Sequence, residues 1–136
     1  MGLVYVDSCV LIYAMEQDPL FGEAARTCLS SQLAQNLQLA ISPLVQLECL
    51  VHPLARQQGE LIIRYQAWLQ TFQWLSINDT TFARATELRA SHGLKTPDAL
   101  HLATALQHGC VALISNDKRL EKVGADLQCL SISAAQ

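Results

Sequence analysis

Three aspartates stand at positions from which their carboxylates could act together. Asp7 follows a short apolar run near the start of the chain, and Asp117 follows a second apolar run. Asp98 lies at the start of a helical segment that leads into the second run. For each residue alone, helix capping and the helix dipole explain an aspartate at such a place. Taken together, the three acids would gather at one edge if both runs are strands of the same sheet.

Glu48 is a fourth acid, and helix capping does not explain it. It lies within a helical segment in which Leu44 and Val51 are its neighbours on the same face. A carboxylate on an apolar face is costly to desolvate unless a cation or hydrogen-bond donors accompany it. No nearby lysine or arginine of its own helical segment can serve. Glu48 therefore predicts a partner from elsewhere in the chain.

Four convergent carboxylates predict a site for a hard divalent cation. Their mutual repulsion would raise some of their pKa values unless a cation neutralises them, and carboxylate oxygens suit Mg²⁺ or Mn²⁺. Such an ion can activate a water molecule and stabilise the transition state of an in-line displacement at phosphorus. The chemistry that these acids predict is metal-dependent phosphodiester hydrolysis.

The elements that must position these acids follow from the apolar pattern. Short apolar runs predict strands at residues 3–6, 39–41, 111–114 and 127–130, with a weaker one at 74–77. Helices are expected at residues 10–15, 20–35, 56–71, 79–92 and 96–108, from Ser42-Pro43 onward, and as a short basic helix after Asp117. Gly109 is the expected stop of the helix that carries Asp98. This alternation predicts a three-layer α/β/α fold around a central parallel sheet of four to five strands.

Length and composition favour one domain with its own core. The chain has 136 residues, of which 51% are hydrophobic and 15% charged, and no linker interrupts it. We expect residues 1–136 to form one domain. The longest apolar run, Cys9 to Met15, is far shorter than the roughly 20 residues that a bilayer span requires. The N-terminal segment lacks the basic region of a signal peptide, so a cytoplasmic location without membrane contact is expected.

The five cysteines form no Cys-x-x-Cys pair, which argues against structural zinc and against a disulfide framework. The net charge is −3, but its distribution is uneven: residues 1–80 hold three basic and seven acidic residues, and residues 81–136 hold six basic and five acidic residues. A polyanion would therefore meet the C-terminal half. Lys118, Arg119 and Lys122 are candidate phosphate contacts, and a merely solvated basic face is the competing interpretation.

Four segments in order carry a resemblance to a known family. The segment Tyr5-Val6-Asp7-Ser8-Cys9-Val10-Leu11-Ile12-Tyr13 is similar to a strand end in the PIN domain family, and Ser42 to Glu48 is similar to the helix that bears the family's glutamate. The most specific match is Thr96 to Ala105, which resembles the family's D-A-x-x-x-A-T-A helix. Leu113 to Asp117 resembles its closing segment. Across nearly the whole chain the sequence resembles a VapC-type ribonuclease toxin of a type II toxin–antitoxin pair.

This resemblance implies a function and a set of site residues. It implies that the metal-binding catalytic acids are Asp7, Glu48, Asp98 and Asp117, with Mg²⁺ or Mn²⁺ as cofactor. It implies polar support for these acids from Ser8 and Ser115. It further implies an RNA substrate, a small antitoxin protein as partner, and a homodimer.

The sequence departs from the family pattern at three places. Cys9 replaces the common asparagine, Ser115 replaces the common threonine, and Arg119-Leu120 stands where many relatives have Asp-Phe. Asp117 is then the residue left to fill the fourth acidic position. Asn116 is a candidate substitute ligand or a neighbour of the ligands, and a turn former in the simpler interpretation.

Other readings of the same fold class fit the residues less well. A receiver domain would want two adjacent acids after the first strand, a haloacid-type phosphatase would want an acid at Cys9, and a dinucleotide-binding domain would want a glycine-rich turn there. The alternative that stays open is a non-cleaving PIN-fold module that binds a protein partner or nucleic acid. His101 could hydrogen-bond to Asp98, one helical turn away, although a lone histidine in an apolar helix is more often a packing residue.

Overall fold

The computed structural model describes residues 2–123 and 127–132, without the side chain of Lys122. The strands are β1 (Leu3–Val6), β2 (Gln38–Ile41), β3 (Gln73–Trp74), β4 (Ala112–Ser115) and β5 (Gln128–Ser131). The helices are α1 (Ser8–Met15), α2 (Gly22–Ala34), α3 (Pro43–Ala55), α4 (Gly59–Leu69), α5 (Asp79–His92), α6 (Thr96–Gln107) and the 3₁₀ helix η1 (Lys118–Lys122).

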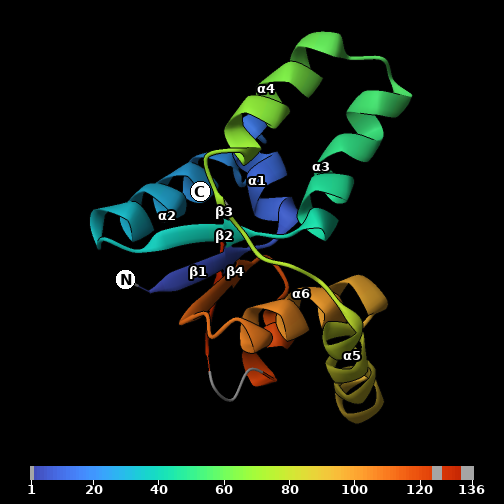
Figure 1. Ribbon diagram of the computed structural model, residues 1–136. Coiled ribbons are helices and arrows are strands. Elements are labelled where there is room, and N and C mark those ends of the chain that lie inside the picture. Colours follow the sequence, from blue (N-terminus) through green and yellow to red (C-terminus); the bar gives the residue numbers. More distant parts are fainter. Residues whose placement is uncertain (1, 124–126, 133–136) are drawn as a thin grey trace.

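The five strands form one parallel sheet in the order β3-β2-β1-β4-β5. Helices α1 and α2 cover one face of the sheet, and α5 and α6 cover the other (Figure 1). Helices α3 and α4 form a hairpin that extends away from the sheet (Figure 1). The predicted three-layer α/β/α architecture is confirmed.

The strand order reverses between β1 and β4, and this position matters for ligands. The chain proceeds from β1 to β2 and β3 in one direction, then returns through α5 and α6 to place β4 on the other side of β1. In open α/β sheets ligands bind beyond the carboxyl ends of the strands at such a reversal. Asp7 follows β1, and Ser115 ends β4, so both lie at this point.

The central elements are buried because they are apolar throughout. Val4, Tyr5 and Val6 of β1 have no exposed surface, and all four residues of β4 are buried. Helix α6 is buried from Ala99 to Ala105, with His101 and Thr104 as its buried polar side chains. It ends at Gln107, and Gly109 follows with a positive φ of 67°, as expected for a helix stop.

One local expectation was wrong. Strand β3 covers only Gln73–Trp74 instead of residues 74–77, because its neighbour β2 ends at Ile41, the residue that pairs with Trp74. Helix α3 begins as expected, with Ser42 at the N-cap position and Pro43 as its first residue, while the Ser42 hydroxyl bonds to Tyr5 and makes no capping hydrogen bond.

All five cysteines are free thiols. Among the described residues no helix combines the length and the apolar character that a membrane crossing would need.

Candidate metal site

Asp7 lies buried at the carboxyl end of β1. Its backbone N–H donates to the carbonyl of Ile114 at 3.0 Å, which ties it to the neighbouring strand β4. Two serines contact its side chain: Ser115 Oγ donates to Oδ2 at 3.0 Å, and Ser8 Oγ, whose one hydroxyl hydrogen is shared with Glu48, lies 3.3 Å from Oδ1. Both serines that the sequence placed beside the acids therefore contact Asp7 directly.

Glu48 reaches the same place from α3. Its Oε1 accepts a hydrogen bond from Ser8 Oγ at 3.0 Å and another from His101 Nε2 at 2.6 Å. Ser8 thus lies between the two carboxylates. The side chain of Glu48 is 26% exposed, so one side of it faces solvent.

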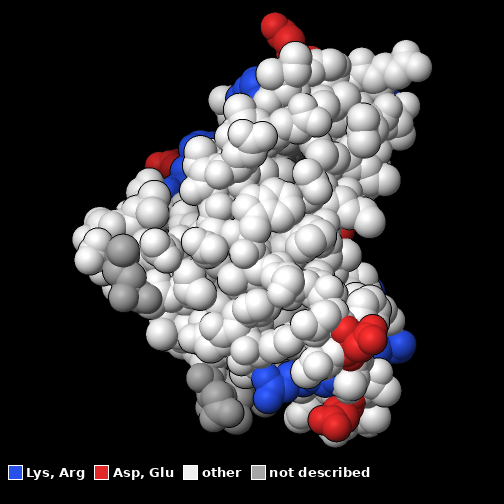
Figure 2. All heavy atoms as spheres, in the orientation of Figure 1, with Lys and Arg blue, Asp and Glu red and all other residues white. Residues whose placement is uncertain are grey.

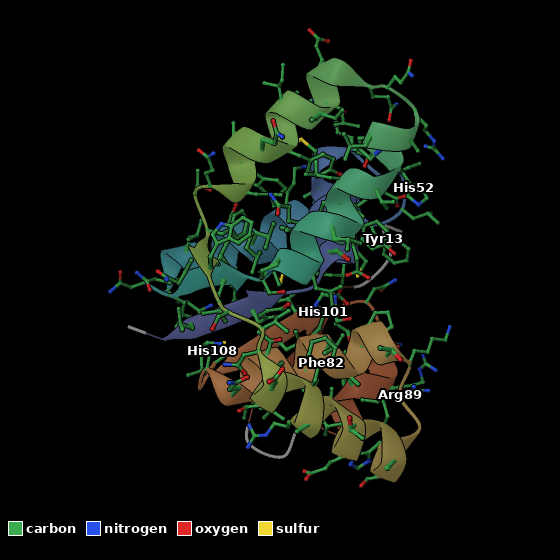
Figure 3. The ribbon with its side chains drawn as sticks, turned by 45° about the vertical axis from the view of Figure 1, so that its right-hand side comes forward. Tyr13, His52, Phe82, Arg89, His101 and His108 are labelled. Atoms are coloured by element: carbon green, nitrogen blue, oxygen red, sulfur yellow. The ribbon has the colours of Figure 1, made fainter. Side chains whose placement is uncertain are left out.

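His101 is the residue that sequence reasoning undervalued. It lies between α6 and α3 in Figure 3, and only 1% of it is exposed. Its Nε2 donates to Glu48 and lies 3.5 Å from Asp7 Oδ1, while its Nδ1 lies 2.7 Å from the Tyr5 hydroxyl. The hydrogen-bond partners of His101 are thus Glu48 and Tyr5, and not Asp98 as the sequence suggested. The position of His101 in an apolar helical segment could have indicated this role. A buried imidazole needs polar partners for both of its nitrogens.

The contact between Glu48 and His101 changes the pKa of each group. Burial alone would raise the pKa of Glu48, but the hydrogen bond and the positive charge of His101 lower it. Burial alone would lower the pKa of His101, but the bond to Glu48 and the charges of Asp7 and Glu48 raise it. The two side chains therefore favour each other's charged form.

Asp98 lies in the first turn of α6, with 20% of its side chain exposed. Burial and then the negative charges of Asp7 and Asp117 raise its pKa, which His101 and Arg119 only partly offset. Asp98 is therefore an acid whose neighbours leave its negative charge incompletely neutralised. A bound cation would remove this repulsion.

Asp117 is held by Arg119. Arg119 Nη2 donates to Asp117 Oδ2 at 2.7 Å and Nε donates to Oδ1 at 3.0 Å, while the backbone N–H of Arg119 donates to Oδ1 at 2.9 Å. These bonds lower the pKa of Asp117. Arg119 Nη2 is also 3.8 Å from Asp98 Oδ2. The guanidinium thus lies beside two of the four acids.

The other candidate residues lie around this group. Asn116 donates to the hydroxyl of Tyr13 on α1 at 3.1 Å. Lys118 is exposed at the surface. The side chain of Lys122 lies outside the described part of the chain.

Three side chains come together closely enough that a cation could lie among them, with the two carboxylates as its ligands, because His101 Nε2 donates its hydrogen to Glu48. One ligand atom from each of Asp7, Glu48 and His101 lies within 4.8 Å of the others. Two carboxylates are the donors that Mg²⁺ or Mn²⁺ requires, and the raised pKa of Asp98 points to negative charge still to be neutralised nearby. The residues present therefore fit a divalent cation at the reversal point of the sheet.

Comparisons with known proteins give a consistent result. The sequence model of the PIN domain matches residues 4–126. Among solved structures, a chain of a toxin–antitoxin complex from Klebsiella pneumoniae is 28% identical, with a TM-score of 0.70 and 90% of each chain covered. The comparison with curated proteins found no match.

Two further structures show the likeness of fold at lower identity. VapBC2 from Rickettsia felis, solved bound to a DNA fragment from its promoter, is 16% identical with a TM-score of 0.77, covering 96% of this chain and 99% of that chain. VapC20 from Mycobacterium tuberculosis, described as a sarcin-ricin loop cleaving toxin, is 14% identical with a TM-score of 0.74, covering 89% and 95%.

Proposed function

The chain belongs to the PIN domain family, and from this membership we propose that it is a metal-dependent endoribonuclease and the toxin of a type II toxin–antitoxin pair. The observation that carries the proposal is the convergence of Asp7 and Glu48, with His101, at the reversal point of the sheet. Helix capping, which could explain each aspartate alone, does not explain a glutamate from α3 at this place.

In this proposal Asp7, Glu48, Asp98 and Asp117 hold Mg²⁺ or Mn²⁺. The bound ion supplies an activated water and neutralises charge on the scissile phosphate. Asp7 is oriented by its two serines, and Glu48 by Ser8 and His101. The cation would stabilise the ionised form of Asp98, whose pKa is raised by burial and by the charges of Asp7 and Asp117.

The same proposal assigns RNA contacts to the basic residues beside the acids. The Arg119 guanidinium is 59% exposed and faces Asp98 and Asp117. A phosphate can accept hydrogen bonds from the same two nitrogens, Nε and Nη2, that now donate to Asp117. The substrate would therefore compete with Asp117 for Arg119. Lys118 and Lys122 are proposed as further phosphate contacts.

One observation favours the alternative, a module that binds a protein or nucleic acid without cleaving. Because Arg119 already neutralises Asp117, the fourth acid is engaged before any metal binds. If that engagement persists, the site would lack one carboxylate. The cleavage assay described below separates this alternative from the nuclease.

An antitoxin partner is proposed on the evidence of an apolar groove. A hollow of about 460 Å³ between α1, α2 and α4 is lined by residues that include Leu29, Leu33 and Trp68, with Arg26 and Arg64 among the lining side chains. The middle of the face shown in Figure 2 is largely uncharged. An apolar helix face with an acidic residue would complement this groove. Toxin–antitoxin complexes among the similar structures support this partner.

A homodimer is proposed through α3. Leu47, Val51 and Leu54 are exposed, and their spacing places them on one side of the helix. An exposed apolar stripe of this kind is typical of an interface. Light scattering of the purified chain tests the proposal, and a monomer at micromolar concentration would contradict it.

Cleavage of RNA with a matched pair of variants tests the proposed activity. The antitoxin-free chain is incubated with structured and with single-stranded RNA, in Mg²⁺, in Mn²⁺ and in EDTA. Asp98→Asn should abolish cleavage, because it keeps the shape and removes one charge. The control is Asp79→Asn, which makes the same change in the first turn of α5, away from the site. Cleavage that survives EDTA or Asp98→Asn would contradict the proposal, and no cleavage by folded wild type would favour the binding module.

A further inference from the structure

A chain of buried hydrogen bonds runs from the end of β2 to the candidate metal site. Ser42 Oγ lies 2.7 Å from Tyr5 Oη, and Tyr5 Oη lies 2.7 Å from His101 Nδ1. His101 Nε2 then lies 2.6 Å from Glu48 Oε1. Ser42 and Tyr5 have no exposed surface, and His101 has almost none. The chain therefore joins β2, β1, α6 and α3 behind the acids.

The last bond of this chain has a fixed direction. A carboxylate only accepts hydrogen bonds, so His101 Nε2 must donate to Glu48 whether the imidazole is neutral or charged. Because Tyr5 bonds to Nδ1 on the opposite side of the ring, the imidazole is held at both nitrogens. Rotation of the ring would break two bonds in a buried place, where an unpaired polar group is costly.

The donors leave one oxygen of Glu48 available. Ser8 and His101 both donate to Oε1. Among the described residues, Oε2 of Glu48 has no hydrogen-bond partner, although the carboxylate is partly exposed. A carboxylate that is held through one oxygen presents the other to a cation in a defined direction.

A packing role alone would not explain these residues. Leucine and phenylalanine would fill the same volume without the desolvation penalty of an imidazole and a phenol. The buried polar atoms of the network are all satisfied, since no buried side-chain nitrogen or oxygen of the described residues lacks a partner. A fully satisfied buried network of this kind specifies one arrangement of the groups that it joins.

We infer that His101, held by Tyr5, is a positioning residue that orients the Glu48 carboxylate for the metal ion. This inference rests on the proposed function, because it requires that the acids bind a divalent cation. His101 acts through Glu48 and does not itself need to contact substrate.

The test is Mn²⁺ binding by the full-length chain without RNA, measured by calorimetry or by the electron paramagnetic resonance signal of free Mn²⁺. Tyr5→Phe keeps the ring and removes only the hydroxyl. We expect its Kd for Mn²⁺ to rise about fivefold, as for the loss of one neutral hydrogen bond. His101→Leu should raise the Kd about 10- to 100-fold, the usual effect of removing a group that orients a metal ligand. His101→Gln, which retains a donor, should recover most of the affinity.

Two controls separate positioning from a general loss of structure. Tyr65→Phe also removes the hydroxyl of a fully buried tyrosine. The Tyr65 hydroxyl bonds to Glu16, which is not among the proposed metal ligands, so this variant should leave the Kd unchanged. In a Glu48→Gln background, Tyr5→Phe should have no further effect on the Kd, because its influence passes through Glu48. Thermal unfolding of each variant establishes that it is folded.

The outcomes are distinct. Tight Mn²⁺ binding by wild type with an unchanged Kd in Tyr5→Phe and His101→Leu would overturn this inference and leave the proposed function standing. An equal loss of affinity in Tyr5→Phe and Tyr65→Phe would also overturn it. Absence of Mn²⁺ binding by the folded wild type would overturn the metal site and this inference together.

Discussion

The guanidinium of Arg119 donates to both carboxylate oxygens of Asp117, from Nε to Oδ1 at 3.0 Å and from Nη2 to Oδ2 at 2.7 Å. The same Nη2 lies 3.8 Å from Asp98. Arg119 is therefore a cation of the chain itself among the acids that we propose as metal ligands. Arg119 competes with a metal ion for the carboxylate of Asp117. An RNA phosphate would in turn compete with Asp117 for the guanidinium of Arg119.

Replacing Arg119 should change metal affinity and RNA affinity in opposite directions. In Arg119→Gln the acids lose a cation, so Mn²⁺ should bind roughly two- to fivefold more tightly, the scale of one exposed ion pair. RNA should bind more weakly, because a phosphate contact is lost. Mn²⁺ titration and RNA binding in Ca²⁺ measure the two effects. Arg84→Gln, on the exposed side of α5, is the control. Weaker Mn²⁺ binding would mean that Arg119 orders Asp117 as a ligand.

Removing the charge of Asp98 should stabilise the metal-free chain. Burial and then the charges of Asp7 and Asp117 raise the pKa of Asp98 above its unfolded value of 3.8, so its ionised form destabilises the fold above the folded pKa. We expect Asp98→Asn in EDTA at pH 7 to melt a few degrees higher than wild type. The difference should vanish as the pH falls below 3.8. Thermal unfolding across pH measures it, and a lower melting temperature at pH 7 would contradict the expectation.

Metal binding should reverse that order. A ligand that binds only the folded state stabilises it, by about 2.7 kcal/mol at 100 times its Kd. Saturating Mn²⁺ should therefore raise the melting temperature of wild type, and EDTA should reverse the rise. Asp98→Asn should gain much less. Equal gains in the two proteins would show that the ion binds elsewhere.

The pair formed by Glu48 and His101 should stabilise the chain in a defined pH window. The raised pKa of His101 contributes stability that is fully present below 6.5 and is lost as the pH rises through the folded pKa. The lowered pKa of Glu48 contributes stability that is present above 4.5 and is lost as the pH falls through the folded pKa. In EDTA, the difference in unfolding free energy between wild type and His101→Gln should be largest between pH 4.5 and 6.5. Urea unfolding from pH 4 to pH 9 tests this, and a constant difference would refute it.

Ser115 should contribute to stability as well as to the site. Its buried hydroxyl donates to Asp7 Oδ2 at 3.0 Å and accepts from the backbone N–H of Asp117 at 3.1 Å. Ser115→Ala leaves both groups with one partner fewer, which should cost about 1–3 kcal/mol of unfolding free energy. Ser131 pairs with Ser115 in the sheet and is less buried, so Ser131→Ala is a matched control with a smaller expected loss. Equal losses in urea unfolding would contradict the special role of Ser115.

A charge in the apolar groove should weaken the antitoxin complex without affecting catalysis. Leu33 is exposed at the rim of the groove, so Leu33→Glu should leave the fold intact. We expect the affinity for the antitoxin to fall by more than about tenfold, because an unpaired carboxylate covered by an apolar partner is costly to desolvate. Copurification with the antitoxin and RNA cleavage without it measure the two properties. Unchanged copurification would place the partner on another surface.

The sequence by itself determined the order of the elements and the placing of the acids at their ends. Apolar runs such as Leu3 to Val6 form strands because a continuous apolar segment is stable when both faces are buried, which is a local property. The alternation of strands and helices then predicted a parallel sheet, and an aspartate directly after β1 has to lie at the sheet edge. These conclusions depend on residues that are close in the chain.

Only the tertiary structure decided which side chains bond to one another. Tyr5 and His101 are 96 residues apart, and Glu48 and His101 are 53 apart, so their contacts depend on how α3 and α6 pack around the reversal point of the sheet. Tertiary packing also explains why the Ser42 hydroxyl bonds to Tyr5 and does not cap α3. A buried hydroxyl needs a hydrogen-bond partner, and packing places the Tyr5 hydroxyl beside it. Periodicity reports which face of an element is buried, whereas hydrogen bonds between elements depend on atomic positions that only the assembled layers determine.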